Sequence, residues 1–360
     1  MKLSLSIALS SLVLFGCGAG AVTSSPSSTP SHPTGPAAAS AFDRALASFV
    51  AHDDAHDWND ASCKEVAAQF ETIGTPSALH DAGLAYQRCN LTPDAIRVLQ
   101  KSVTDGQFKD APALVTLAGL QMKRDGASEE AKTNIQRALA NDDAFMPAYD
   151  ELALWYLTAK KLDLAALVCS QGIKKNASYA PIHNTLGLVE NATGRVNAAL
   201  AAFAEARRLD PKLFDAHMNY ALVNLGFRGW EQAREGFTRA LALRPNDYEA
   251  HLGMALALRG PITGSESDLE SRIGAVQGEL DACKRIDPSR PDAWFNEGIL
   301  TQEFRTKAAP DPEHTKVVLD QATRTFETFL EKAKGKARYE VAAKRAAGRL
   351  EDIEAMRQFL

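Results

Sequence analysis

Two histidines near residue 55 have the spacing of a metal site. His52 and His56 are four residues apart, which would place both imidazoles on one face of a helix, and Asp53, Asp54 and Asp57 surround them. A zinc protease helix of this spacing carries a Glu directly after its first histidine, and further ligands lie nearby. This stretch has neither feature. The pattern therefore favours an exposed acidic helix end, and we expect no metal and no other cofactor.

Three further histidines, His183, His217 and His251, recur at intervals of 34 residues. A strict period places equivalent residues in successive structural units, so they would be too far apart to act as a catalytic pair. We expect these histidines to pack between helices. The chain also lacks a G-x-S-x-G motif, a P-loop and a G-x-G-x-x-G turn in a βαβ context. The sequence thus predicts no catalytic residues and no enzyme.

The first residues have the pattern of an export signal. Lys2 provides the positive start, and the apolar stretch that follows is too short to span a bilayer as a mature helix. Residues 1–16 end on Leu14-Phe15-Gly16, directly before Cys17. This resembles the bacterial lipobox, although Phe15 is bulkier than that family prefers. The resemblance implies acylation of Cys17, and Gly18 after it implies the periplasmic face of the outer membrane. An ordinary signal peptide cleaved elsewhere is the alternative.

The segment after the lipobox is almost entirely Gly, Ala, Ser, Thr and Pro, from Gly18 to Ser40. Such a composition cannot bury a core, so residues 17–41 are predicted to be an extended tether. At about 3.1 Å per residue, it would reach on the order of 70 Å from the bilayer.

Composition limits the class of protein to which the rest of the chain can belong. Of 360 residues, 45% are hydrophobic and 24% charged, which is enough apolar material for a sizeable core. The net charge of −5 argues against a nucleic-acid partner, because such proteins usually carry a basic patch.

Four cysteines remain once Cys17 is set aside, an even number in an exported protein. None belongs to a C-x-x-C pair, so a zinc ribbon or a thioredoxin-like site is unsupported. Cys63 and Cys89 are a candidate disulfide across neighbouring helices. Cys169 and Cys283 occupy helical core positions and are expected to be buried thiols.

One pattern repeats through most of the chain. A small residue recurs every 34 positions, and a second one follows twelve positions later. The first set is Gly119, Ala153, Gly187, Ala221 and Ala255, and the second is Ala131, Ala165, Ala199 and Ala233. Phe203 and Phe237 share the period, and Pro211 and Pro245 close two successive repeats. Two antiparallel helices cross closely only where side chains are small, and proline ends the second helix.

This pattern resembles the tetratricopeptide repeat, or TPR. The resemblance implies an all-α, right-handed superhelical solenoid of about seven helix-turn-helix repeats over residues 76–330. We expect an additional degenerate helical pair at residues 42–75 and a charged capping helix within 331–360. Two polar insertions, at residues 260–267 and 308–313, are predicted to be surface loops.

By the same resemblance, the residue after each small crossing residue faces a concave groove that binds partner proteins. Here these positions are all aliphatic: Leu84, Leu120, Leu154, Leu188, Leu222, Leu256 and Ile299. This aliphatic ladder predicts an apolar groove for an amphipathic or extended hydrophobic segment, and the alternative is that its members are core. A carboxylate clamp for chaperone tails is not expected, because only Asn219 or Asn296 fits one of its positions.

The whole layout resembles the TPR lipoprotein of the adventurous gliding motility machinery. That resemblance implies a membrane-anchored scaffold for protein–protein interactions in the assembly of a cell-envelope complex. A lipoprotein of type IV pilus or secretin biogenesis is one alternative. An accessory factor of outer-membrane or cell-wall enzymes is another.

Overall fold

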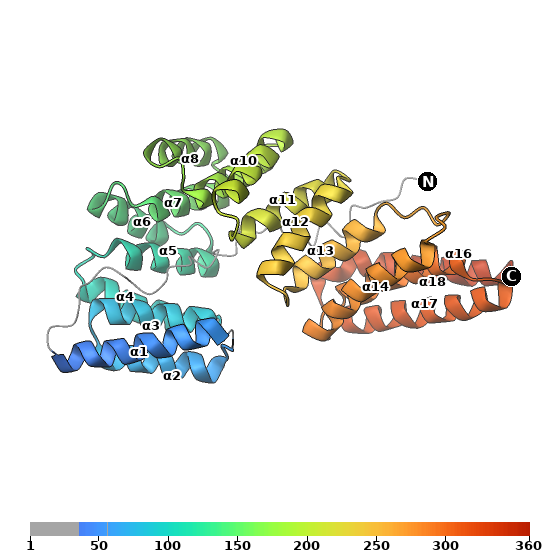
Figure 1. Cartoon of the computed structure of the whole chain (residues 1–360), viewed down its shortest axis with the longest axis horizontal. Coiled ribbons are helices and arrows are strands. Elements are labelled where there is room, and N and C mark those ends of the chain that lie inside the picture. The colour runs from blue at the N-terminus through green and yellow to red at the C-terminus, as the bar shows by residue number, and fades with distance from the viewer. Residues whose placement is uncertain (1–35, 56) are drawn as a thin grey trace. The chain divides into compact units, whose positions relative to one another are not determined.

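The computed structural model describes residues 36–55 and 57–360, and every regular element in these ranges is a helix (Figure 1). The predicted signal segment, Cys17 and His56 lie outside the described residues. The described chain forms two compact units, which we call the N-terminal unit (residues 36–202) and the C-terminal unit (residues 203–360). No described helix has both the length and the apolar character needed to cross a bilayer.

The N-terminal unit is a stack of helical hairpins. It starts with α1 (Pro36–Ala55) and α2 (Asp60–Ile73). The hairpins that follow are α3 (Pro76–Arg88) with α4 (Thr92–Asp105), α5 (Ala111–Asp125) with α6 (Glu129–Asn141), α7 (Met146–Thr158) with α8 (Leu162–Lys175), and α9 (Ala180–Ala192) with α10 (Val196–Leu209). The boundary between the two units falls within α10.

The C-terminal unit continues the hairpin pattern with longer connections. Its pairs are α11 (Phe214–Gly226) with α12 (Trp230–Leu243), and α13 (Tyr248–Arg259) with α14 (Leu269–Ile286). The last pair joins α15 (Asp292–Leu300), the π-helix η2 (Thr301–Arg305) and α16 (Thr306–Ala308) to α17 (Pro312–Ala333). A short 3₁₀ turn, η3 (Ala337–Tyr339), leads to α18 (Glu340–Gln358). The hairpins from α3 to α17 number seven, as the repeat pattern predicts.

Two boundaries differ from those expected. Helix α1 begins at Pro36, so residues 36–41 are helical where an extended tether was predicted. The reason is the alanine run 37–39 behind a proline: alanine has the highest helix propensity, and proline is favoured at the first helical position. Helix α17 also runs to Ala333, a few residues into the segment assigned to the cap.

Small residues are required where the paired helices cross. A Cβ atom added at Gly83 would lie 2.6 Å from Cγ of Leu99 on the partner helix. One added at Gly298 would lie 2.6 Å from the Phe326 ring. Protein interiors are packed so densely that neighbouring atoms would have to move to relieve such short contacts. Other repeats have alanine at this crossing position, and their helices leave room for its methyl group. Ala153 is one of these alanines, and it is fully buried.

The periodic histidines close the turns that precede their helices. Nε2 of His183, His217 and His251 each lies 2.9 Å from a backbone carbonyl oxygen six residues earlier, at Ala177, Pro211 and Pro245 respectively. The His217 ring accepts a hydrogen bond at Nδ1 from Nε of Arg207, which leaves Nε2 as the donor. Burial lowers the pKa of His217, so a neutral ring fits this arrangement.

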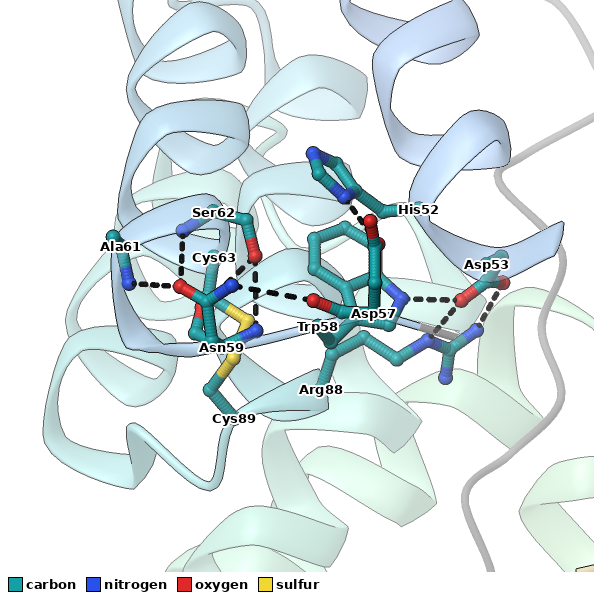
Figure 2. Close-up of a disulfide and its surroundings, with 10 residues drawn as sticks. All are labelled: His52, Asp53, Asp57, Trp58, Asn59, Ala61, Ser62, Cys63, Arg88 and Cys89. Carbon is teal, nitrogen blue, oxygen red and sulfur yellow. Dashed lines mark hydrogen bonds and ion pairs between the residues drawn. A yellow bond between two sulfur atoms is a disulfide. The ribbon is translucent and has the colours of Figure 1, made fainter. Parts of the chain in front are cut away.

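The predicted disulfide is present, and it joins the start of α2 to the end of α3 (Figure 2). The Cα atoms of Cys63 and Cys89 are 6.3 Å apart, within the usual range for a disulfide. Cys169 and Cys283 are free and buried, as expected. The bond therefore adds a covalent link to the packing of two neighbouring helices.

Polar contacts beside the disulfide fasten α1 to α3 (Figure 2). The Arg88 guanidinium donates two hydrogen bonds of 2.8 Å to the Asp53 carboxylate, and Nε1 of Trp58 donates a third, of 2.7 Å. His52 Nδ1 lies 2.6 Å from Oδ1 of Asp57, so this histidine has a carboxylate partner. No group of three potential metal ligands occurs among the described residues. The acidic residues at and after the end of α1 therefore take part in contacts within the fold.

Candidate binding surface on the first helices

The aliphatic ladder is mostly buried. Five of its members are at most 7% exposed: Leu84, Leu120, Leu188, Leu222 and Leu256. Side chains with so little accessible surface leave almost none for a partner to contact. Their burial therefore favours the alternative that these residues belong to the core. Leu154 and Ile299 are partly exposed. Binding of a partner at the ladder stays a prediction, and it now depends on these two positions.

A row of polar side chains lies one turn earlier on the first helices of the N-terminal unit. Its members occupy the positions two and three residues before each small crossing residue. We call this row the polar stripe: His80 and Asp81 on α3, Thr116 on α5, Asp150 and Glu151 on α7, and Asn184 and Thr185 on α9. All are buried except Asp150, which is partly exposed. At the equivalent positions in the C-terminal unit, α11 carries the buried Asn219 and α15 carries the buried Asn296, whereas α13 has only Leu252 and Gly253. Polar side chains are therefore denser at these positions in the N-terminal unit.

Hydrogen bonds connect the stripe from one hairpin to the next. Nε2 of His80 on α3 lies 3.3 Å from Oγ1 of Thr116 on α5. Because that hydroxyl donates its proton to the carbonyl of Pro112, it accepts from the histidine. Oγ1 of Thr185 on α9 donates to Oδ1 of Asp150 on α7 at 2.6 Å. These contacts satisfy polar groups within the stack and fix the side chains of neighbouring first helices against one another.

Two carboxylates in the stripe, those of Asp81 and Glu151, are buried. Asp81 is fully buried, and neither of its carboxylate oxygens has a hydrogen-bond partner among the described residues. Its Oδ1 lies 3.5 Å from Nδ1 of His80. Glu151 is 7% exposed. Its Oε1 lies over Gly119 on α5, 3.0 Å from the place of a Cβ, so an alanine there would require the carboxylate to shift.

Burial, together with the neighbouring charge of Asp150, raises the pKa of Glu151 to about 8. Burial also raises the pKa of Tyr179 and of the Cys169 thiol, and Asp150 contributes to both. The other charged groups that act on these three residues are all acidic, Glu190 among them.

The C-terminal unit has a different polar feature, around the π-helix η2. Nη1 of Arg259 donates to Oδ1 of Asn296 at 3.0 Å, and burial lowers the pKa of this arginine to about 10. Arg349 on the capping helix α18 donates to Oε1 of Gln302 at 3.0 Å and forms an ion pair with Glu303 at 2.6 Å. These contacts fasten α18 to the last repeat, as a cap requires.

The sequence analysis did not predict the polar stripe, although five of its seven members recur every 34 residues. Thr116, Asp150 and Asn184 are spaced by 34 residues, as are Glu151 and Thr185. The predicted groove comprised only the position directly after each crossing residue. Comparing all positions of the first helix for polarity would have revealed the stripe, because polar side chains are rare inside a helical stack.

No protein-family model matches this sequence, and no curated protein sequence matches it. Solved structures do match. Yeast Tom70 is similar over 98% of this chain and 70% of its own, with a TM-score of 0.59 and 14% identity. Cut9–Hcn1 of the APC/C is similar over 72% and 52%, with a TM-score of 0.52 and 16% identity. PilF of Pseudomonas aeruginosa is similar over 67% and 98%, with a TM-score of 0.48 and 20% identity. The chain has the fold of a TPR solenoid.

Proposed function

We propose that this protein is a lipid-anchored TPR scaffold that binds other polypeptides during assembly of a cell-envelope complex. The observation that carries the proposal is the solenoid of seven helical hairpins. Stacked helical repeats create extended surfaces suited to binding other polypeptides. The proposed role is binding and not turnover, in keeping with the TPR solenoid fold.

The proposed anchor is a lipid on Cys17 at the periplasmic face of the outer membrane. It is supported by the lipobox resemblance and by the Pro- and Ser-rich tether after it. Multiple acyl chains make anchoring stable, since each buried methylene contributes about 0.8 kcal/mol. In Cys17→Ala cells labelled with a palmitate analogue, we expect the protein to lose the label and leave the membrane fraction. Membrane residence without label would contradict the anchor.

The proposed complex is the gliding motility machinery, on the basis of the layout of lipobox, tether, repeats and cap. The test is chemical crosslinking in intact cells, followed by purification of the tagged protein from membranes. We expect motility proteins to be recovered with the wild type. Recovery of a secretin with pilus proteins, or of cell-wall enzymes, would assign the scaffold to another envelope process. The purified protein alone should not hydrolyse peptidoglycan, and hydrolysis would overturn the binding role.

A further inference from the structure

One arginine beside the π-helix η2 has neutral partners only. Arg259 is the last residue of α13 and is partly exposed. Its Nη1 donates to the backbone oxygen of Asn296 at 3.3 Å and to Oδ1 of the same residue at 3.0 Å. Both acceptors belong to uncharged groups, and Arg259 forms no ion pair with any described residue. The positive charge of this side chain therefore has no direct countercharge within the described fold.

The charged groups around Arg259 do not compensate it. Those that act on it are Glu303 on η2 and Arg349 on the capping helix α18. These two pair with each other at 2.6 Å, so the Glu303 carboxylate is already matched by the Arg349 guanidinium. Two arginines and one glutamate leave a net positive charge at this place. A cation withdrawn from water without a countercharge is costly, and burial accordingly lowers the pKa of Arg259.

The free edge of the Arg259 guanidinium has the geometry that a carboxylate requires. Nε and Nη2 lie on one edge of this planar group, and neither donates a hydrogen bond to a described residue. Two parallel N–H donors on such an edge match the two oxygens of a carboxylate. The buried Asn296 accepts from Nη1 and so restrains the orientation of the guanidinium. The fold thus positions a pair of donors and leaves their acceptor to a ligand.

The residues next to Arg259 complete a small surface. Arg259 and Gln302 occupy the same position in successive first helices, four residues after the small crossing residue. One turn before Gln302 is Ile299, a partly exposed member of the aliphatic ladder. Gln302 lies in η2, and π-helical turns are rare elements that often occur at functional sites. We call Arg259, Asn296, Ile299 and Gln302 the arginine site.

We propose that the arginine site binds an aspartate or glutamate side chain of the partner polypeptide. Nε and Nη2 of Arg259 would donate to the two carboxylate oxygens, and the methylene groups of the acidic side chain would contact Ile299. This inference rests on the proposed function, because it specifies the chemistry of the partner. Arg259 occupies none of the basic positions of the carboxylate clamp for chaperone tails, so the arginine site is a different one.

The test uses the full chain, purified in detergent, with a fluorescent oligoglutamate peptide as the probe. An oligoglutamine peptide of the same length is the neutral control. The chain has a net charge of −5 and repels an anionic probe on average, so binding would report a local site. The test variant is Arg259→Gln. The matched control is Arg324→Gln, which removes an exposed arginine from α17 of the same unit. Circular dichroism verifies that each variant is folded.

We expect the wild type to bind oligoglutamate and not oligoglutamine. Arg259→Gln should bind oligoglutamate at least about tenfold more weakly, and Arg324→Gln should bind it nearly as well as the wild type. Equal weakening in both variants would show an effect of diffuse surface charge and would overturn the inference. So would equal binding of oligoglutamine.

A second measurement needs no variant. Amide hydrogen exchange of the wild type should become slower at the end of α13 and in η2 when oligoglutamate is added. Protection confined to other helices would overturn the inference even if Arg259→Gln did not fold. If oligoglutamate does not bind while envelope proteins are still recovered by crosslinking, the arginine site is wrong and the scaffold role stands. Loss of recovery from the wild type would refute the scaffold role itself.

Discussion

The pH dependence of folding stability provides a direct test of the Glu151 environment. In the unfolded chain this carboxyl has an ordinary pKa near 4.5, and in the folded chain burial raises its pKa to about 8. Between these values the folded state holds a proton that the unfolded state has lost. Stability therefore decreases as the pH rises through this range. Replacing Glu151 by Gln, a neutral side chain of the same shape, should remove the decrease.

The structure sets the size of this effect. The pKa values of about 8 and 4.5 differ by more than three pH units. Each unit corresponds to about 1.4 kcal/mol, so the largest possible contribution is roughly 5 kcal/mol. Water entering beside the carboxylate in the folded state would reduce this value. We expect the stability of Glu151→Gln relative to the wild type to increase by roughly 2 to 5 kcal/mol between about pH 4.5 and about pH 8.

The assay is urea unfolding followed by circular dichroism, together with amide hydrogen exchange of α7, because repeat proteins can unfold in parts. Other groups titrate in the same range, among them His217, whose pKa is lowered by burial. Their contributions cancel when the variant is compared with the wild type at each pH. Glu130→Gln on the exposed face of α6 is the control and should follow the wild type. Parallel stability profiles for Glu151→Gln and the wild type would refute the reasoning.

Further predictions concern the disulfide, the helix crossing at Gly298 and the aliphatic ladder. Cys89→Ser should cost roughly 3 kcal/mol, because the disulfide closes a loop of sequence separation 26, and unfolding of the wild type in reductant should reproduce this loss. Gly298→Ala should destabilise by roughly 1–3 kcal/mol, because its Cβ would lie 2.6 Å from an aromatic ring of α17. Gly348→Ala on α18, with open space around it, should not destabilise the protein. In thermal melts, Leu188→Asn should lose roughly 2–5 kcal/mol as a core substitution. If Leu154 faces a partner, Leu154→Asn should instead reduce the recovery of crosslinked envelope proteins while leaving the melting temperature nearly unchanged; a lower melting temperature with unchanged recovery would place Leu154 in the core.

Most of the fold was predictable because its contacts are local. The 34-residue period specifies the two helices of each hairpin and the small residues where they cross, and these contacts lie within one repeat. The number of hairpins follows from counting that period. The start of α1 was predicted less well, because the residue types of a flexible linker (Pro, Ser and Gly) surround an alanine run that favours helix.

The binding surface was predicted less well than the fold. Leu120 and Leu154 occupy the same position of successive repeats, yet the first is 1% exposed and the second is accessible. A repeat pattern cannot distinguish them, because exposure depends on the side chains of the next hairpin, which differ from repeat to repeat.

By itself, the sequence determined that this chain is a series of helical hairpins and that Cys63 and Cys89 could form a bond. Only the tertiary structure decided that most of the aliphatic ladder is buried, and that Glu151 lies where burial raises its pKa. The physical reason is that helix periodicity follows from near neighbours, whereas burial and electrostatic environment are set by contacts between side chains of successive hairpins.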